Sequence, residues 1–207
     1  VSLEGPEGSG KTTLCVKLKG LLIAKGYEVV SVREPGGTNI GNQVRGVLLD
    51  QSNTSMVPEA EFLLFSASRA QLIRETIIPS LNNGSIVLCD RFLDSSLAYQ
   101  GYGHGLDVSV LHDISKFVTS GVEPHITILL DIPPKEGLSR RRQDPETWNR
   151  LDAYSVKFHE RVRAGFLKMA KENHERWKVV DATQQEDKIF EEVSDILLEA
   201  LEKINNN

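Results

Sequence analysis

Hydrophobic residues follow two alternating patterns along the chain. Short apolar runs, typical of strands buried in a parallel sheet, occupy 1–3, 28–32, 85–89, 125–132 and 177–180. Between these runs, apolar residues recur at every third or fourth position, which predicts amphipathic helices over 13–25, 41–50, 58–81, 108–118, 135–142, 154–171 and 188–204. Strands that alternate with helices in this way predict a parallel sheet covered by helices on both faces.

Polar clusters follow the first three predicted strands directly. They are the glycine-rich segment 5–12, the segment 33–38 and the pair Asp90 and Arg91. Because crossovers between parallel strands are right-handed, the carboxyl ends of the strands meet at one edge of the sheet, where α/β proteins bind ligands. We therefore expect the three clusters to converge on one cleft.

The first cluster, GPEGSGKT at 5–12, matches the phosphate-binding pattern G-x-x-x-x-G-K-[ST]. Glycines let successive backbone N–H groups approach a polyphosphate at the positive end of the following helix. Lys11 can reach the β- and γ-phosphates, and the Thr12 hydroxyl can bind Mg²⁺. The alternative, a glycine-rich turn with a chance lysine, does not explain why the motif joins a strand to a helix. The predicted nucleotide site comprises Gly5, Pro6, Glu7, Gly8, Ser9, Gly10, Lys11, Thr12 and Thr13.

The other two clusters add charge at the same edge. Arg33, Glu34 and Pro35 begin a loop that could be a simple turn, although a turn does not account for the charged pair. Asp90 could hold Mg²⁺ and Arg91 could bind a phosphate bidentately. The alternative is an ion pair that closes the strand.

Two side-chain pairs could recognise a planar base. Phe65 and Arg69 lie one helical turn apart, and such a pair can stack on a base and hydrogen-bond to it. On spacing alone, the pattern favours the alternative of a core phenylalanine with an arginine that reaches solvent. If 93–101 is helical, Ser96 and Gln100 share a face, and the glutamine amide suits a base edge.

An arginine-rich segment interrupts the last third of the chain. Three arginines at 140–142 are followed by a polar loop that ends near Arg150. Such a segment is either a solvated helix face or a lid over phosphates, and the P-loop favours the lid. We expect one domain over 1–207 with a small lid at about 140–150, and no second domain.

Composition narrows the class of protein. The net charge of −5 gives no electrostatic case for nucleic-acid binding, and no apolar run is long enough to span a bilayer. The two cysteines, Cys15 and Cys89, fall in a predicted helix and a predicted strand, which suggests buried thiols in the cytoplasm. They do not have the spacing of zinc ligands. Because the first strand is short, we expect the natural protein to have residues before Val1.

Taken in order, these motifs resemble the thymidylate kinase family of the bacterial type. The resemblance is carried by 5–12, by 33–38, by Phe65 with Ser68 and Arg69, and by 90–101, and it covers nearly the whole chain. It implies a three-layer P-loop fold with a five-stranded parallel sheet. It also implies transfer of the γ-phosphoryl group of ATP to dTMP with Mg²⁺, and a homodimer.

The resemblance also implies roles for single residues. Lys11 and Thr12 would hold the ATP phosphates and Mg²⁺, with Asp90 beside the metal, and Glu7 would face the 3′-hydroxyl of dTMP. The acceptor would be bound by Arg33, Glu34, Pro35, Arg45, Phe65, Arg69, Arg91, Ser95, Ser96, Tyr99 and Gln100.

Within that acceptor site, Phe65 would stack on thymine and Arg69 would donate to its O4. Tyr99 would pack against the deoxyribose. Because the P-loop contains no arginine, the family pattern puts the catalytic arginine in the lid, at Arg140, Arg142 or Arg150. Phe92 stands where the family commonly has tyrosine.

Three other functions compete with this one. A deoxynucleoside kinase would need a carboxylate base for a neutral hydroxyl, whereas several arginines here suit an anionic acceptor. A GTP-dependent switch would show D-x-x-G and N-K-x-D motifs, which the sequence lacks. A non-catalytic nucleotide-binding regulator does not explain the intact Lys11, Thr12 and Asp90.

Overall fold

Five parallel strands form the centre of the molecule. The computed structural model describes residues 1–143 and 148–205, and its sheet has the order β2-β3-β1-β4-β5. The strands are β1 (Ser2–Glu4), β2 (Val29–Arg33), β3 (Ile86–Asp90), β4 (Thr127–Asp131) and β5 (Trp177–Asp181). Each overlaps one of the five predicted apolar runs, so the predicted parallel sheet is confirmed.

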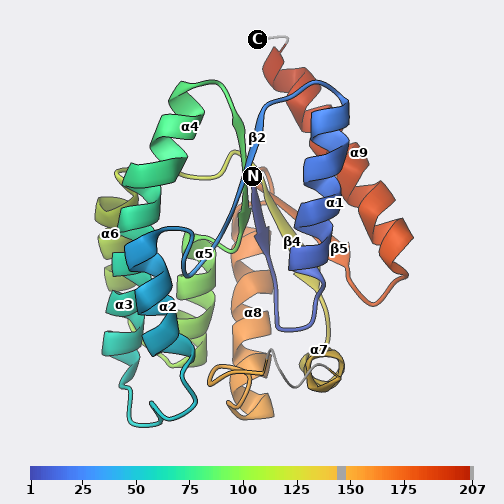
Figure 1. Cartoon of the computed structure of the whole chain (residues 1–207). Helices are drawn as coiled ribbons and strands as arrows, with labels where there is room; N and C mark the ends of the chain where they lie inside the picture. The colour runs from blue at the N-terminus through green and yellow to red at the C-terminus, as the bar shows by residue number, and fades with distance from the viewer. Residues whose placement is uncertain (144–147, 206–207) are drawn as a thin grey trace.

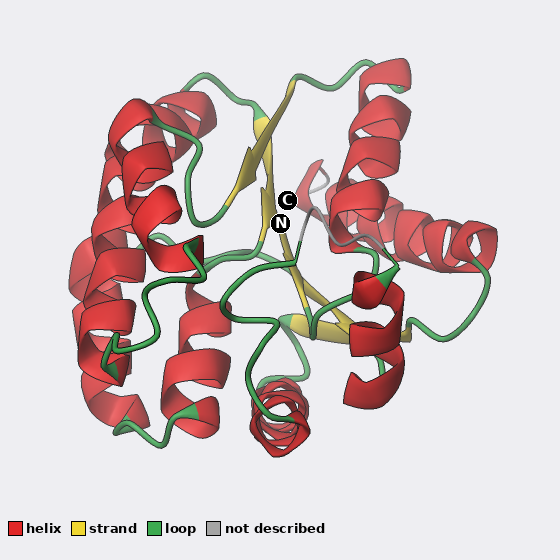
Figure 2. Cartoon of the chain, turned by 60° about the horizontal axis from the view of Figure 1, so that its bottom comes forward, coloured by secondary structure: helices red, strands yellow, loops and turns green. Residues whose placement is uncertain are grey.

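Helices cover both faces of this sheet (Figures 1 and 2). The helices are α1 (Lys11–Ala24), α2 (Asn39–Leu49), α3 (Pro58–Leu72), α4 (Ile78–Asn82), α5 (Leu93–Ser96), α6 (Val108–Thr119), α7 (Pro134–Arg142), α8 (Val156–Glu172) and α9 (Glu186–Asn205). Two π-helical turns, η1 (Ile73–Ile77) and η2 (Leu97–Gly103), continue α3 and α5. Within the described residues, no helix has the length and apolar character needed to cross a membrane.

The core has one layer on each side of the sheet. On one side, Leu3 and Ile128 from the strands pack against Leu14 and Leu18 of α1 and Val193 of α9. The other side holds two clusters, one under α3 and α6 and one under α8. This three-layer arrangement agrees with the fold expected from the sequence.

The predicted helix over 58–81 contains a wider turn that its periodicity does not reveal. The chain is α-helical in α3, π-helical in η1 and α-helical again in α4. Pro79 lies in the first turn of α4 and has no N–H to donate to the carbonyl of Glu75. The π turn ends two residues before this proline, and it contains Glu75, whose carbonyl lacks the N–H that another residue at 79 would donate.

Strand register brings the polar strand ends together. Leu3 and Arg33 both lie opposite Asp90, from β1 and β2 on either side of β3. The segments after β1, β2 and β3 therefore start side by side at one edge of the sheet, the lower edge in Figure 1. This confirms the expected convergence of the three polar clusters.

Candidate active site

A cavity of about 340 Å³ opens at this edge. Its walls come from the P-loop, from the ends of β2 and β3, and from the helices α2, α3, α5 and η2. The end of α7 and residues 149 and 151 complete the lining. The lining residues are Glu7, Gly8, Ser9, Gly10, Lys11, Thr12, Thr13, Arg33, Glu34, Pro35, Arg45, Leu49, Phe65, Arg69, Asp90, Arg91, Ser95, Ser96, Tyr99, Gln100, Arg140, Arg141, Asn149 and Leu151. Most of the residues expected at the site therefore share one cavity. Gly5, Pro6, Arg142 and Arg150 do not line it.

The P-loop holds its lysine close to its own backbone. Lys11 Nζ donates to Gly5 O at 3.0 Å, to Pro6 O at 2.8 Å and to Ser9 Oγ at 2.9 Å. Burial and the nearby positive charge of Arg91 lower the pKa of Lys11 to about 7. Gly5 and Pro6 thus serve the site through their carbonyl groups, behind the cavity wall.

The P-loop and α7 contact each other through backbone atoms, at a glycine on each side. A Cβ at Gly8 would collide with the carbonyl oxygen of Gly137, and a Cβ at Gly137 would collide with the carbonyl oxygen of Glu7. Gly8 also has a φ of +69°, in the left-handed region that glycine tolerates. Both glycines are therefore required by the close approach of two backbones.

Two oxygen ligands suitable for Mg²⁺ lie together where the P-loop ends. Thr12 Oγ1 donates to Asp90 Oδ2 at 2.6 Å, and Asp90 is buried. Mg²⁺ prefers oxygen ligands and usually takes only one or two from the protein, with phosphates and water as the others. No group of three His, Cys, Asp or Glu side chains in the described part of the chain could hold a metal. The oxygens of Thr12 and Asp90 thus fit a Mg²⁺ that is bound together with phosphates.

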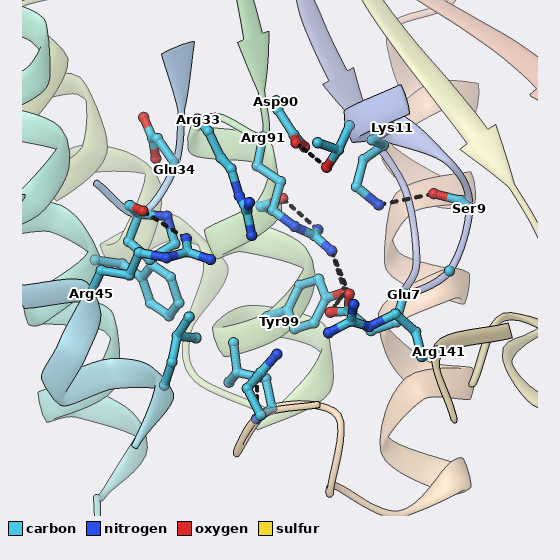
Figure 3. Close-up of a pocket in the computed structure, with 18 of the residues that line it drawn as sticks. Glu7, Ser9, Lys11, Arg33, Glu34, Arg45, Asp90, Arg91, Tyr99 and Arg141 are labelled. Carbon is cyan, nitrogen blue, oxygen red and sulfur yellow. Dashed lines mark hydrogen bonds and ion pairs between the residues drawn. The ribbon is translucent and has the colours of Figure 1, made fainter. Parts of the chain in front are cut away.

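Arg91, Glu7 and Tyr99 form a connected group at the floor of the cavity (Figure 3). Arg91 Nη2 lies 2.9 Å from Glu7 Oε2 and 3.2 Å from the Tyr99 hydroxyl, which donates to Glu7 Oε1 at 2.7 Å. Burial alone would raise the pKa of Glu7, but Arg91 and Lys11 hold that pKa at about 2. Glu7 is therefore an anion that turns the Arg91 guanidinium toward the P-loop.

The backbone of Arg91 is held in a left-handed conformation, with a φ of 71°. A non-glycine residue in this region needs support from its surroundings. Glu4, at the end of β1, accepts hydrogen bonds from the next backbone N–H, that of Phe92, at 2.8 Å and from Ser95 Oγ at 2.5 Å. Burial and the nearby Asp94 raise the pKa of Glu4 to about 7. Sequence analysis did not identify Glu4, although a glutamate inside an apolar strand is an unusual residue.

Arg33 and Arg45 add positive charge near Arg91, with Arg33 next to it in Figure 3. Arg45 Nη1 donates to Pro35 O at 2.8 Å, which fixes its position beside the 33–38 loop. Burial and the charges of Arg33, Arg91 and Arg141 lower the pKa of Arg45 to about 10. A partly buried arginine whose pKa is lowered by other arginines indicates an excess of positive charge, which suits an anionic ligand.

Phe65 and Arg69 line the next part of the cavity. Arg69 is only 1% exposed, so the alternative of an arginine that reaches solvent is wrong. Its Nε donates to Glu34 Oε2 at 2.7 Å, and its Nη2 donates to Ser96 Oγ at 3.0 Å. Burial raises the pKa of Glu34, and the charge of Arg69 opposes that shift. Phe65 is half-buried and lies against the cavity.

Two of the expected lid arginines are not at the cavity. Arg150 is buried and donates to Glu61 Oε2 at 2.6 Å and to Leu48 O at 2.9 Å, so it is an internal ion-pair partner. The Arg142 guanidinium lies over the Trp148 ring, 5.6 Å from its centroid. The predicted catalytic roles of Arg142 and Arg150 are therefore not supported by their positions.

Arg140 and Arg141 do line the cavity. Arg140 donates to Ala182 O at 2.9 Å and to Glu136 Oε1 at 2.7 Å. Arg141, which the sequence did not single out, lines the same cavity as Glu7 and pairs with Asp152 Oδ2 at 2.8 Å. Residues 144–147 of the expected lid lie outside the described residues.

Three more residues that line the cavity, Leu49, Asn149 and Leu151, are not predicted from the sequence, and neither is Glu61 behind it. The sequence offers one signal for Arg141. It lies four residues after Gly137, so both share the face of α7 that touches the P-loop. The spacing alone does not point to the P-loop, and it becomes informative only when the contact of Gly137 with Glu7 is known.

Comparisons with known proteins agree on one family. The family model described as thymidylate kinase matches residues 3–193. The thymidylate kinase of Deinococcus radiodurans is 49% identical over 195 residues, which cover 93% of each chain. That of Roseiflexus sp. strain RS-1 is 46% identical over 208 residues, which cover 95% of this chain and 92% of the relative.

A solved structure agrees as well. The crystal structure of thymidylate kinase from Ehrlichia chaffeensis superposes with a TM-score of 0.77 at 34% identity, covering 95% of this chain and 96% of that one. The residues matched by the family model, 3–193, include every residue that lines the cavity. The chain belongs to the thymidylate kinase family.

Proposed function

We propose that this chain transfers the γ-phosphoryl group of ATP to dTMP and yields dTDP and ADP. The observation that carries the proposal is the single cavity. Its lining contains the P-loop lysine, several arginines, and Phe65 with Arg69. The match to the thymidylate kinase family supports the same reaction.

The reaction joins two anions, so the site has to neutralise charge and align the reactants. An oxygen of the dTMP phosphate attacks the γ-phosphorus, the bond to the β–γ bridging oxygen breaks, and ADP leaves with that oxygen. No general base is required, because the attacking group is already a phosphate oxyanion. Lys11 would neutralise the donor phosphates, and Arg33, Arg45 and Arg91 would hold the acceptor phosphate.

Mg²⁺ bound by Thr12 and Asp90 would supply charge neutralisation at the β- and γ-phosphates. Arg140 and Arg141 are the arginines of the expected lid whose positions suit stabilisation of the transferring group, since both line the cavity. Arg141 shares this lining with Glu7 of the P-loop.

At the other end of the cavity, Phe65 would stack on thymine, and Arg69, Ser96 and Gln100 would face the edge of the base. Tyr99 would pack against the deoxyribose, with Glu7 near the 3′-hydroxyl. Glu34 and Pro35 would complete this wall, and Ser95 would support Arg91 through their 3.1 Å contact.

We further propose that two copies of the chain form a dimer through α3 and α6. These helices pack against each other and carry Leu63, Val110 and Phe117, with exposed fractions of 55%, 52% and 85%. Exposed apolar side chains on two helices in contact, here called the apolar patch, favour an interface. We also propose the cytoplasm as the place of action, because both cysteines are free and buried, as in proteins of reducing compartments.

A coupled assay of ADP release tests the reaction. ATP and Mg²⁺ are supplied with dTMP, dUMP, dCMP, dGMP, AMP or thymidine as the acceptor. We expect turnover with dTMP, with dUMP a poor second. Turnover with thymidine but not dTMP would indicate a deoxynucleoside kinase. Turnover with another monophosphate would overturn the roles given to Phe65, Arg69 and Gln100.

A further inference from the structure

A buried carboxylate, Glu61, lies behind the base pocket and does not line the cavity. Its two oxygens have different partners. Oε1 accepts from Gln100 Nε2 at 2.7 Å and lies 3.2 Å from His104 Nε2. Oε2 accepts from Arg150 Nη2 at 2.6 Å and from the Tyr154 hydroxyl at 2.9 Å. Glu61 therefore ties Gln100 on one side to an ion pair on the other.

The charge state of Glu61 determines which end of the Gln100 amide faces it. Burial alone would raise the pKa of Glu61, but hydrogen bonds from His104, Gln100 and Arg150 hold that pKa at about 2. An ionised carboxylate only accepts hydrogen bonds, so Gln100 must turn its NH₂ group toward Glu61. Its carbonyl oxygen then points the other way. That oxygen is buried and accepts no hydrogen bond from any described residue.

Arg69 supplies the complementary group. Its Nη1 is buried and donates to no described residue, whereas its Nε and Nη2 are bound to Glu34 and Ser96. Arg69 and Gln100 both line the cavity, and each side chain is only 1% exposed. Two side chains of the cavity wall thus each hold one buried polar group without a partner, a donor on Arg69 and an acceptor on Gln100.

This pair matches one class of pyrimidine. Thymine and uracil carry an acceptor at O4 next to a donor at N3–H. Cytosine carries the reverse, a donor at its 4-amino group and an acceptor at N3. A cytosine in the pocket would leave the Arg69 donor and the Gln100 acceptor buried and unpaired, and unpaired buried groups give strong discrimination.

We propose that Glu61 is a positioning residue that makes the pocket select 4-keto pyrimidines over cytosine, by fixing the orientation of the Gln100 amide. The proposal rests on the proposed function, because it concerns the acceptor of the same reaction. Without the carboxylate, the Gln100 amide can turn by half a rotation at little steric cost and present its NH₂ group instead.

The test compares kcat/KM for dTMP, dUMP and dCMP in the wild type and in Glu61→Gln. We expect the ratio of dTMP to dCMP to fall at least about tenfold in the variant. The ratio of dTMP to dUMP should stay unchanged, because both bases present the same edge. A merely structural defect would lower all three values together and leave both ratios constant, and that result would overturn the proposal.

Two further variants sharpen the test. Tyr154→Phe is the matched control, since it removes a contact to Oε2 and leaves the Gln100 contact to Oε1 intact; its ratio of dTMP to dCMP should equal that of the wild type. Gln100→Leu should lose the discrimination, and adding Glu61→Gln to it should cause no further loss if Glu61 acts through Gln100. Additive losses would contradict the proposed link.

The variants distinguish a failure to fold from an error in the proposed reaction or in the role of Glu61. If Glu61→Gln does not fold, the double variant Glu61→Met with Arg150→Met removes the anchor without leaving a buried unpaired charge, and the same loss of discrimination is expected. If the wild type does not phosphorylate dTMP, the proposed function is wrong. If it does and the discrimination survives the loss of Glu61, only the role of Glu61 is wrong.

Discussion

Single arginines in this protein differ in function because of their partners. Arg69 and Arg91 are both paired with carboxylates and still face the cavity, whereas Arg150 is paired with Glu61 behind it. All three belong to charged or polar segments of the sequence. Sequence analysis could assign Arg69 and Arg91 because each occurs in a motif, but the partner that removes Arg150 from the site is 89 residues away.

Asp90→Asn tests the proposed metal site. Asparagine keeps the shape of the side chain but removes the charge that holds a divalent cation. We expect the Mg²⁺ concentration needed for half-maximal activity to rise, and kcat to fall, by roughly 10- to 100-fold. Titration of activity with Mg²⁺ measures both effects.

The matched control for this variant is Asp107→Asn. Asp107 is the N-cap of α6, where asparagine caps equally well, so its Mg²⁺ titration should coincide with that of the wild type. An Asp90→Asn enzyme with an unaltered Mg²⁺ requirement would show that the carboxylate is not part of the metal site.

Secondary-structure elements were predicted well where one side of the element is buried. The sequence reveals all five strands, because each contains apolar residues that the layers of helices bury at least in part. The π turns η1 and η2 were not found, because widening a helix by one residue leaves the residue types unchanged. Of the two π turns, η2 belongs to the site, because its residues Tyr99 and Gln100 line the cavity.

The contact between the P-loop and α7 gives a test at the level of elements. Gly137→Ala would place a methyl group against the carbonyl oxygen of Glu7, so the P-loop or α7 has to move. We expect the affinity for ATP to fall by about tenfold or more and the melting temperature to fall as well. Isothermal titration calorimetry and thermal unfolding measure the two effects.

Gly20→Ala in the middle of α1 is the matched control. Apart from the neighbouring backbone of α1 itself, no described atom lies within 4 Å of a Cβ at that position. Because alanine is favoured over glycine in a helix, the variant should be more stable by up to about 1 kcal/mol, with unchanged ATP affinity. If Gly137→Ala behaved in the same way, the two backbones would not be in the close contact described above.

At the scale of the whole molecule, the two faces of the sheet differ. Helices α1 and α9 cover one face, while α3, α6 and α8 lie on the other. The apolar patch of Leu63, Val110 and Phe117 belongs to the outer surface of that second face. Sequence periodicity could not reveal this patch, since exposed and buried leucine or valine residues look the same within one helix.

Phe117→Lys tests the proposed dimer. A charged side chain at the most exposed residue of the patch should prevent association, so sedimentation velocity should give the 23.0 kDa chain in place of twice that mass. Val16→Lys on α1, at a site that is 69% exposed, is the matched control and should leave the mass unchanged. Equal masses for the wild type and Phe117→Lys would rule out this interface.

Lys11 of the P-loop should couple the binding of the nucleotide to the uptake of protons. With its pKa at about 7, Lys11 is only about half protonated near neutral pH while it contacts the loop carbonyls. A bound polyphosphate favours the charged form and raises the pKa toward its usual value. Binding of Mg²⁺ and ATP at pH 7 should therefore take up about half a proton, with more uptake at pH 8 and almost none at pH 5.

This uptake can be measured by calorimetry in buffers that differ in ionisation enthalpy. The observed heat should depend on the buffer at pH 7 and 8 and not at pH 5. Lys11→Arg, whose guanidinium stays charged throughout this range, should show no buffer dependence if it still binds the nucleotide. A wild-type heat that is independent of the buffer at pH 8 would mean that the lysine is fully charged before ATP arrives.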